Sequence, residues 1–163
     1  MPPIPLTPHS SAELLELHAA ITLELRERGV LRSANNPTGD LAEYLFCKAF
    51  GWEQAANSES GFDATGEDGI RYQIKSRRLH RPNTSRQVSA LRRLETGPFD
   101  VLAGALFAPD YTVQRAALIP ISVVREHAAY RSHTNAHIFH LRDAVWGIAG
   151  VEDVTDALRA VVL

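Results

Sequence analysis

A carboxylate, an amide and an amine occur close together in the middle of the chain. Asp63 lies in one short apolar segment, and Gln73 and Lys75 lie in the next. Gly66 and Gly69 supply turn residues between the segments, so the spacing predicts two short strands joined by a tight turn. Strand side chains alternate, so this hairpin would bring all three polar groups to one sheet face. Such a cluster is costly for packing alone and indicates a site.

The basic residues are concentrated immediately after this turn. The formal net charge is −2, yet the segment from Gly69 to Leu94 holds no Asp or Glu and eight of the 17 Lys and Arg residues. A local field of one sign attracts phosphates even on an acidic protein. The alternative is a solvated face or a flexible loop. The residues that we expect to contact nucleic acid are Arg77, Arg78, Arg81, Ser85, Arg86, Arg92 and Arg93.

Part of this basic segment has a helical pattern. Ser85 can cap a helix from Arg86 to about Glu95, in which Val88, Leu91 and Leu94 face inward. The N-terminus of such a helix would add its own attraction for phosphate.

A further acid, Glu43, lies on a helix predicted from about Asp40 to Phe50. A helix acid, Phe62-Asp63 at the end of a strand, and then Gln73-Ile74-Lys75 resemble the motif of the PD-(D/E)XK nuclease family. The resemblance covers about residues 38–108, and the rest of the chain is similar to small stand-alone bacterial proteins of this class. Phe62 stands in place of the usual Pro, and Gln73 in place of the usual Asp or Glu.

This resemblance implies a restriction-endonuclease-like fold and a metal-dependent nuclease acting on DNA. It implies that Asp63, Gln73, Glu43 and the Ile74 carbonyl hold Mg²⁺ or Mn²⁺. Hard oxygen ligands suit these ions, which shield phosphoryl charge and activate water. Lys75 would orient or help to deprotonate the water, or stabilise developing charge.

Gln73 leaves two other functions open, because it removes one negative charge from the metal site. The chain could be a catalytically silent nucleic-acid-binding module on the same fold. It could also be an interaction subunit of a defence or repair system. One active site makes one cut, so cleavage of both DNA strands would favour a homodimer.

The remaining sequence predicts one domain over residues 1–163, with a proline-rich flexible tail at 1–9 and a core at about 38–119. We expect an α/β fold with a mixed sheet (an αβββαβ core), helices on both faces and extra terminal helices. Ser10 or Ser11 can cap the first helix, with Glu13 well placed for its first turn, and this helix runs to about Arg28. Later strands are expected at 99–107, 111–119 and 135–141, and helices at 120–129 and 151–162.

Bulk properties agree with an ordinary protein of the cytoplasm. The hydrophobic fraction is 45%, and no apolar run predicts a membrane span or a secretion signal. Cys47 is the only cysteine, which predicts a buried thiol on a helix. The histidines at 127, 133, 137 and 140 lack the spacing of a zinc module and are expected to be structural or at the surface.

Overall fold

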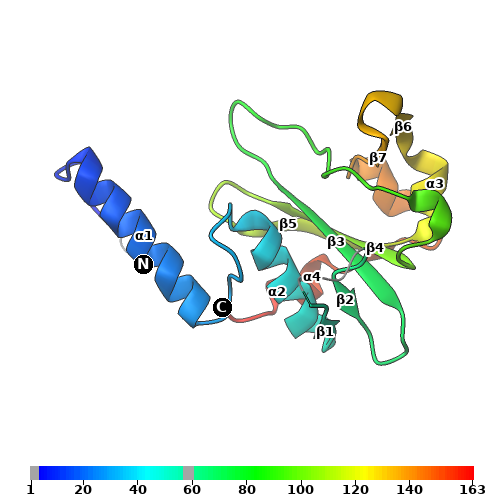
Figure 1. The fold of residues 1–163 in the computed structure, drawn as a ribbon, viewed down its shortest axis with the longest axis horizontal. Coiled ribbons are helices and arrows are strands. Elements are labelled where there is room, and N and C mark those ends of the chain that lie inside the picture. The colour runs from blue at the N-terminus through cyan, green and yellow to red at the C-terminus, as the bar shows by residue number, and fades with distance from the viewer. Residues whose placement is uncertain (1–3, 57–60) are drawn as a thin grey trace.

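A mixed sheet of six strands runs through the centre of the protein (Figure 1). The structure is a computed structural model that describes residues 4–56 and 61–163, so most of the polar turn expected at 57–61 lies outside the described residues. Strand order is β1-β2-β3-β4-β5-β8, in which only β3 and β4 are parallel. The strands are β1 (Glu53–Gln54), β2 (Ala64–Thr65), β3 (Arg71–Arg78), β4 (Val101–Phe107), β5 (Val113–Pro120) and β8 (Glu152–Asp153).

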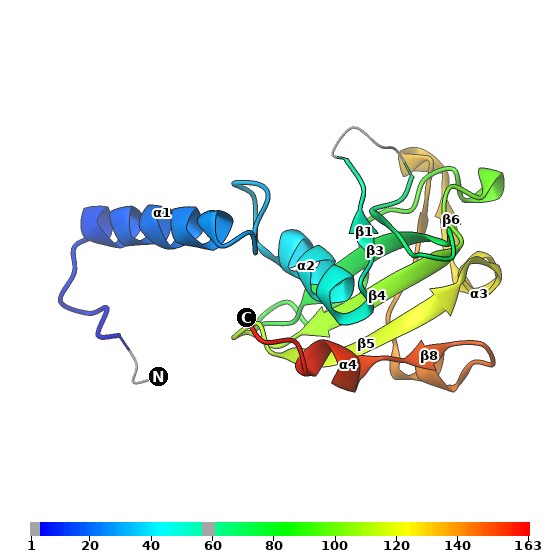
Figure 2. The ribbon, with the colours of Figure 1, turned by 90° about the horizontal axis from the view of Figure 1, so that it is seen from below.

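Helix α2 (Thr38–Phe50) and the short α4 (Thr155–Arg159) cover one face of the sheet (Figure 2). Apolar residues of α2 recur at helical spacing, so Leu41, Leu45 and Phe46 are buried against β3 and β4. Helix α3 (Ile121–His127) packs on the other face. Strand β4 lies between these two layers and is almost wholly apolar, as expected for a strand covered on both faces. The expectation of a mixed α/β fold is confirmed at this level.

The prediction of a helix at 86–95 is wrong. This segment is not helical: it holds two isolated bridge residues, Gln87 and Leu91, and is followed by a 3-10 turn, η1 (Leu94–Thr96). Its backbone pairs instead with a distant segment: the Leu91 amide donates to the His137 carbonyl at 2.9 Å, and the His137 amide donates back at 2.8 Å. Val88, Leu91 and Leu94 are nevertheless buried. A spacing of three residues therefore identified core positions but not the backbone conformation, which long-range hydrogen bonds decide.

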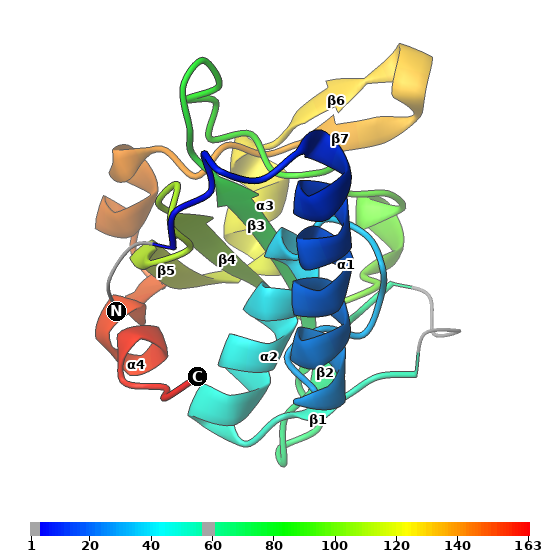
Figure 3. The same ribbon diagram turned by 90° about the vertical axis from the view of Figure 1, so that its left-hand side faces the viewer.

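Helix α1 (Ser11–Glu27) has the expected start, but of its apolar residues only the half-buried Leu25, near its end, packs against the core. Ser10 and Glu13 form a reciprocal capping box. The helix extends away from the sheet (Figure 2), and Figure 3 shows it in front of the other elements. No residue in it is buried. Leu15, Ile21 and Leu23 are 70%, 47% and 55% exposed. Helix periodicity thus indicated the element but not a partner for it.

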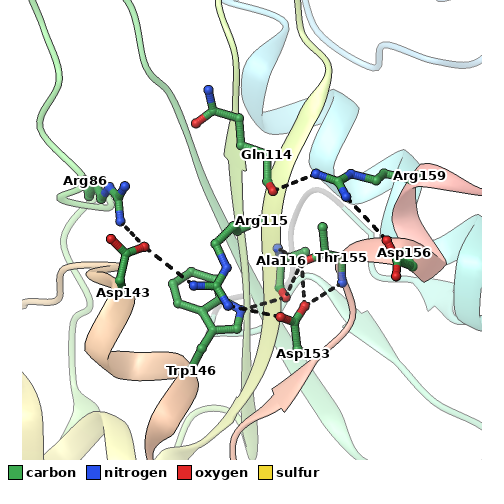
Figure 4. A network of polar contacts seen from close by, with 10 residues as sticks. All are labelled: Arg86, Gln114, Arg115, Ala116, Asp143, Trp146, Asp153, Thr155, Asp156 and Arg159. Carbon is green, nitrogen blue, oxygen red and sulfur yellow. Dashed lines mark hydrogen bonds and ion pairs between the residues drawn. The ribbon is translucent and has the colours of Figure 1, made fainter.

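The C-terminal third departs most from the expected elements. The strand expected at 135–141 is only β7 (Ala136–Ile138), which pairs with β6 (Ala129–Arg131) in a separate hairpin. The helix expected at 151–162 is replaced by β8 and α4. Asp153 ends this strand, pairs with Arg115 at 3.1 Å and accepts a hydrogen bond from the Thr155 hydroxyl (Figure 4). Among the described residues, no helix has the length and apolar character needed to cross a membrane.

Candidate active site

The candidate site lies at the sheet edge where β2 begins and β3 continues past it. Asp63 immediately precedes β2, and its backbone is fixed on both sides. Its amide donates to the Tyr72 carbonyl at 2.7 Å, and its carbonyl accepts from the Ala55 amide at 2.9 Å. Gly69, with φ of +78°, closes the turn that returns the chain into β3. Backbone pairing with β3 therefore places the Asp63 side chain beside the residues expected to join it.

The Asp63 carboxylate is the point at which these residues meet. Its Oδ2 atom accepts hydrogen bonds from the Gln73 side-chain amide and, at 2.6 Å, from the Ile74 backbone amide. Lys75 Nζ lies 3.9 Å from the same oxygen. The Asp63 and Lys75 side chains are 25% and 21% exposed, so this ion pair is shielded from water but not sealed. The structure thus brings together the carboxylate, amide and ammonium that the sequence singled out.

Glu43 approaches from α2 with two partners of its own. Its Oε2 atom accepts a hydrogen bond from Gln54 Nε2 at 2.6 Å and lies 3.6 Å from Arg32 Nη1. Burial and then the negative charge of Asp63 raise the pKa of the Glu43 carboxyl, against the opposing effects of Gln54 and Arg32. The negative charge of Asp63 thus disfavours the ionised form of Glu43. A cation between the two carboxylates would offset this effect.

Arg32 and Gln54 are members of this site that the sequence did not reveal. Arg32 lies in the loop before α2, and it also donates two hydrogen bonds of 3.3 Å to the Ala55 carbonyl. Gln54 lies in the two-residue strand β1. Neither residue belongs to a pattern with its site partners, so no local signal could have found them.

The predicted nucleic-acid contacts are dispersed around the site. Arg77 and Arg78 end β3, and Arg78 lies over the Tyr111 ring at 4.4 Å. Arg81 lies in the exposed loop that follows. Arg86 pairs with Asp143 at 2.6 Å, which offsets its charge (Figure 4).

Ser85 caps no helix, because the helix expected there is absent. Its hydroxyl instead accepts a hydrogen bond from the Gln87 amide at 3.3 Å. Ser85 therefore does not provide the helix N-terminus that we expected to attract phosphate. Arg92 and Arg93 are exposed, and both line two neighbouring cavities.

Cys47 lies one turn after Glu43 on the inner side of α2. Burial first, and the charge of Glu43 second, raise the pKa of its thiol to about 11. A thiol with so high a pKa is a poor nucleophile, in keeping with a structural cysteine.

No family model matches the chain, and comparison with curated proteins finds no match. The site is therefore interpreted from its own geometry and chemistry.

Proposed function

We propose that the protein is a metal-dependent nuclease that hydrolyses phosphodiester bonds in DNA. The observation that carries the proposal is the convergence of Gln73, Ile74 and Lys75 on the Asp63 carboxylate. The six-stranded mixed sheet with its preceding helix α2 is consistent with a restriction-endonuclease-like fold, which we include in the proposal.

The donor atoms at the site fit a hard divalent cation with an incomplete protein shell. Within the described part of the chain, no three His, Cys, Asp or Glu side chains group closely enough to hold a metal ion. Two carboxylates, from Asp63 and Glu43, are nevertheless what Mg²⁺ commonly takes from a protein, with waters and substrate phosphate completing its shell. Gln73 donates its amide nitrogen to Asp63, and its amide oxygen is a further candidate ligand. Bound there, Mg²⁺ or Mn²⁺ would lower the pKa of a water and shield charge on the phosphoryl oxygens.

The side chains of the protein have separate roles in this proposal. Asp63 and Glu43 supply negative charge, and the Ile74 amide fixes the orientation of the Asp63 carboxylate. Lys75 places an ammonium beside Asp63, where it can orient the attacking water or stabilise charge on the phosphate. Arg77 continues the same strand face and can bind the substrate backbone.

The proposal is tested by incubating the purified protein with plasmid and linear DNA in Mg²⁺ or Mn²⁺. Asp63→Ala should abolish cleavage, and Lys75→Ala should slow it by about 100-fold or more. Lys48 is the only other lysine in the chain and is exposed on α2, so Lys48→Ala is the matched control and should cleave normally. Cleavage that survives both Asp63→Ala and Lys75→Ala would refute the assignment.

A second candidate function is a catalytically silent nucleic-acid-binding module. It is favoured by the charge balance of the site, since Lys75 already faces Asp63 and Arg32 already faces Glu43. This candidate predicts salt-sensitive DNA binding without cleavage. Calorimetry with Mg²⁺ separates the two functions: a nuclease should bind the ion in a way that Asp63→Ala abolishes, and a silent module should not.

A further inference from the structure

A cavity of about 490 Å³ opens next to Gln73, on the side of the site away from Lys75 along β3. We call it the arginine pocket, and its walls are formed chiefly by Phe62, Arg71, Gln73, Arg92, Arg93 and Pro98. Its volume is in the range of small-molecule sites, roughly 300–1,000 Å³. Because Gln73 also contacts Asp63, a molecule in this pocket would lie against the candidate active site.

Two arginines, Arg92 and Arg93, line the pocket from a stretch of backbone held by buried neighbours. Leu91 and Leu94, on either side of them, are each 2% exposed. Arg125 holds the following turn with hydrogen bonds of 3.1 and 2.9 Å to the Leu94 carbonyl. Arg93 itself has a left-handed backbone, with φ of +53°, which residues other than glycine adopt seldom. The backbone that carries Arg92 and Arg93 is therefore held in place beside the pocket that both residues line.

The charges of the pocket suit a phosphate. Arg71 lines the pocket, but its charge is offset by Asp100, with which it pairs at 2.9 Å. Among the described residues, no ion pair involves Arg92 or Arg93. Guanidinium groups that form no ion pair within the protein can bind phosphate oxygens strongly, through two parallel hydrogen bonds.

The other walls suit a nucleobase. Phe62 is half-buried and, with Pro98, gives the pocket an apolar side on which a base can stack. Gln73 offers an amide at the edge of the pocket. A base can reach these groups only when it is outside a duplex stack. Extruding a paired base costs a few kcal/mol, so an unpaired base would bind here more easily.

A second cavity, of about 440 Å³, lies on the other side of the same two arginines. It is lined by Tyr130 and His137 of the β6–β7 hairpin. The Leu91–His137 backbone pairing attaches this hairpin, labelled in Figure 1, to the segment that carries Arg92 and Arg93. Tyr130 is 53% exposed. A pair of arginines flanked by two aromatic-lined cavities is the arrangement that suits successive unpaired nucleotides, with cations for the backbone and rings for the bases.

We infer that the arginine pocket binds one unpaired nucleotide, so that the substrate of the site is single-stranded DNA. This inference rests on the proposed function, because it names the strand that crosses the site at Asp63. The neighbouring nucleotide then lies against Tyr130.

The test is fluorescence anisotropy with a labelled 12-nucleotide single strand and the matching duplex, in EDTA so that binding is measured without cleavage. Wild-type protein should bind the single strand about tenfold more tightly than the duplex. Tyr130→Ala should weaken single-strand binding about fivefold or more and leave duplex binding unchanged. Arg93→Gly, which suits the left-handed backbone, should also weaken single-strand binding about fivefold or more. Arg92→Gln is a second variant that does not alter this backbone.

Arg26→Gln is the matched control, because Arg26 is exposed on α1 and its loss changes the net charge equally. The inference is overturned if the duplex binds as tightly as the single strand, or if the pocket variants change binding no more than Arg26→Gln. Loss of cleavage in Asp63→Ala with normal binding by the pocket variants would retain the nuclease and reject the pocket. Weakened binding by the pocket variants, in a protein that never cleaves DNA, would retain the pocket and reject the nuclease.

Discussion

Arg71 and Asp100 form a two-pronged ion pair between the start of β3 and the segment before β4. Arg71 Nη2 lies 2.9 Å from Asp100 Oδ1, and Arg71 Nε lies 3.1 Å from Asp100 Oδ2. The same guanidinium donates to the carbonyls of Gly97 and Pro98 at 3.0 and 3.2 Å. One side chain therefore fixes both the entry to β4 and one wall of the arginine pocket.

This pair should make stability depend on pH in the acid range. Hydrogen bonds from the Arg71 side chain and backbone lower the pKa of Asp100 below 3.8. Its contribution to stability is therefore complete above that pH and is lost as the pH falls through the lowered pKa. Asp100→Asn should lower the free energy of unfolding by no more than about 1 kcal/mol at pH 7, because solvent screens the pair.

Urea unfolding of both proteins at pH 7, 5 and 3 measures this effect. The difference between wild type and Asp100→Asn should be the same at pH 7 and 5 and smaller at pH 3. If the difference in free energy of unfolding between the two proteins does not become smaller at pH 3, the Arg71–Asp100 pair is not the source of the acid dependence.

Cys47 should resist alkylation in the folded protein. With its pKa raised to about 11, the fraction of thiolate at pH 7.5 is on the order of one in a few thousand. Iodoacetamide in EDTA should react about 100-fold more slowly with folded protein than with protein unfolded in urea. Equal rates in the two states would contradict the burial of this thiol.

Gly104 leaves room for a core side chain. A β-carbon at this position would lie 2.8 Å from Leu141 Cδ2, and Leu141 is fully buried among core residues. Gly104→Ala should therefore cost about 1–3 kcal/mol of stability through overpacking.

Gly39, in the first turn of α2, is the matched control for this substitution. A β-carbon there meets nothing within 4 Å, so Gly39→Ala should raise stability by up to about 1 kcal/mol. Thermal unfolding of the two variants should shift in opposite directions. A harmless Gly104→Ala would mean that Leu141 can repack.

Two leucines test the difference between α2 and α1. Leu45 of α2 is 2% exposed, so Leu45→Ala should cost about 2–5 kcal/mol in free energy of unfolding. Leu23 of α1 is 55% exposed, so Leu23→Ala should change it by less than about 0.5 kcal/mol. Denaturant unfolding of both variants gives the comparison. A large loss in Leu23→Ala would reveal a partner for α1.

Patterns that depend on neighbouring residues were readable from the sequence. Helix α2, the capping box at Ser10 and Glu13, and the buried strand β4 follow from periodicity and capping chemistry. The meeting of Asp63, Gln73 and Lys75 also follows, because a tight turn and strand alternation settle which residues share a face.

Contacts between distant segments had to come from the tertiary structure. The stretch at 86–93 has helical spacing, yet it is not helical, because its backbone bonds to the β7 region. Likewise, the pairing of Glu43 with Arg32 and Gln54 depends on how α2 lies against the sheet edge. The sequence by itself determined the polar cluster and its residues, since both depend on local geometry. The tertiary structure decided which cations balance the cluster and which cavity adjoins it, because these depend on hydrogen bonds and packing between segments far apart in the chain.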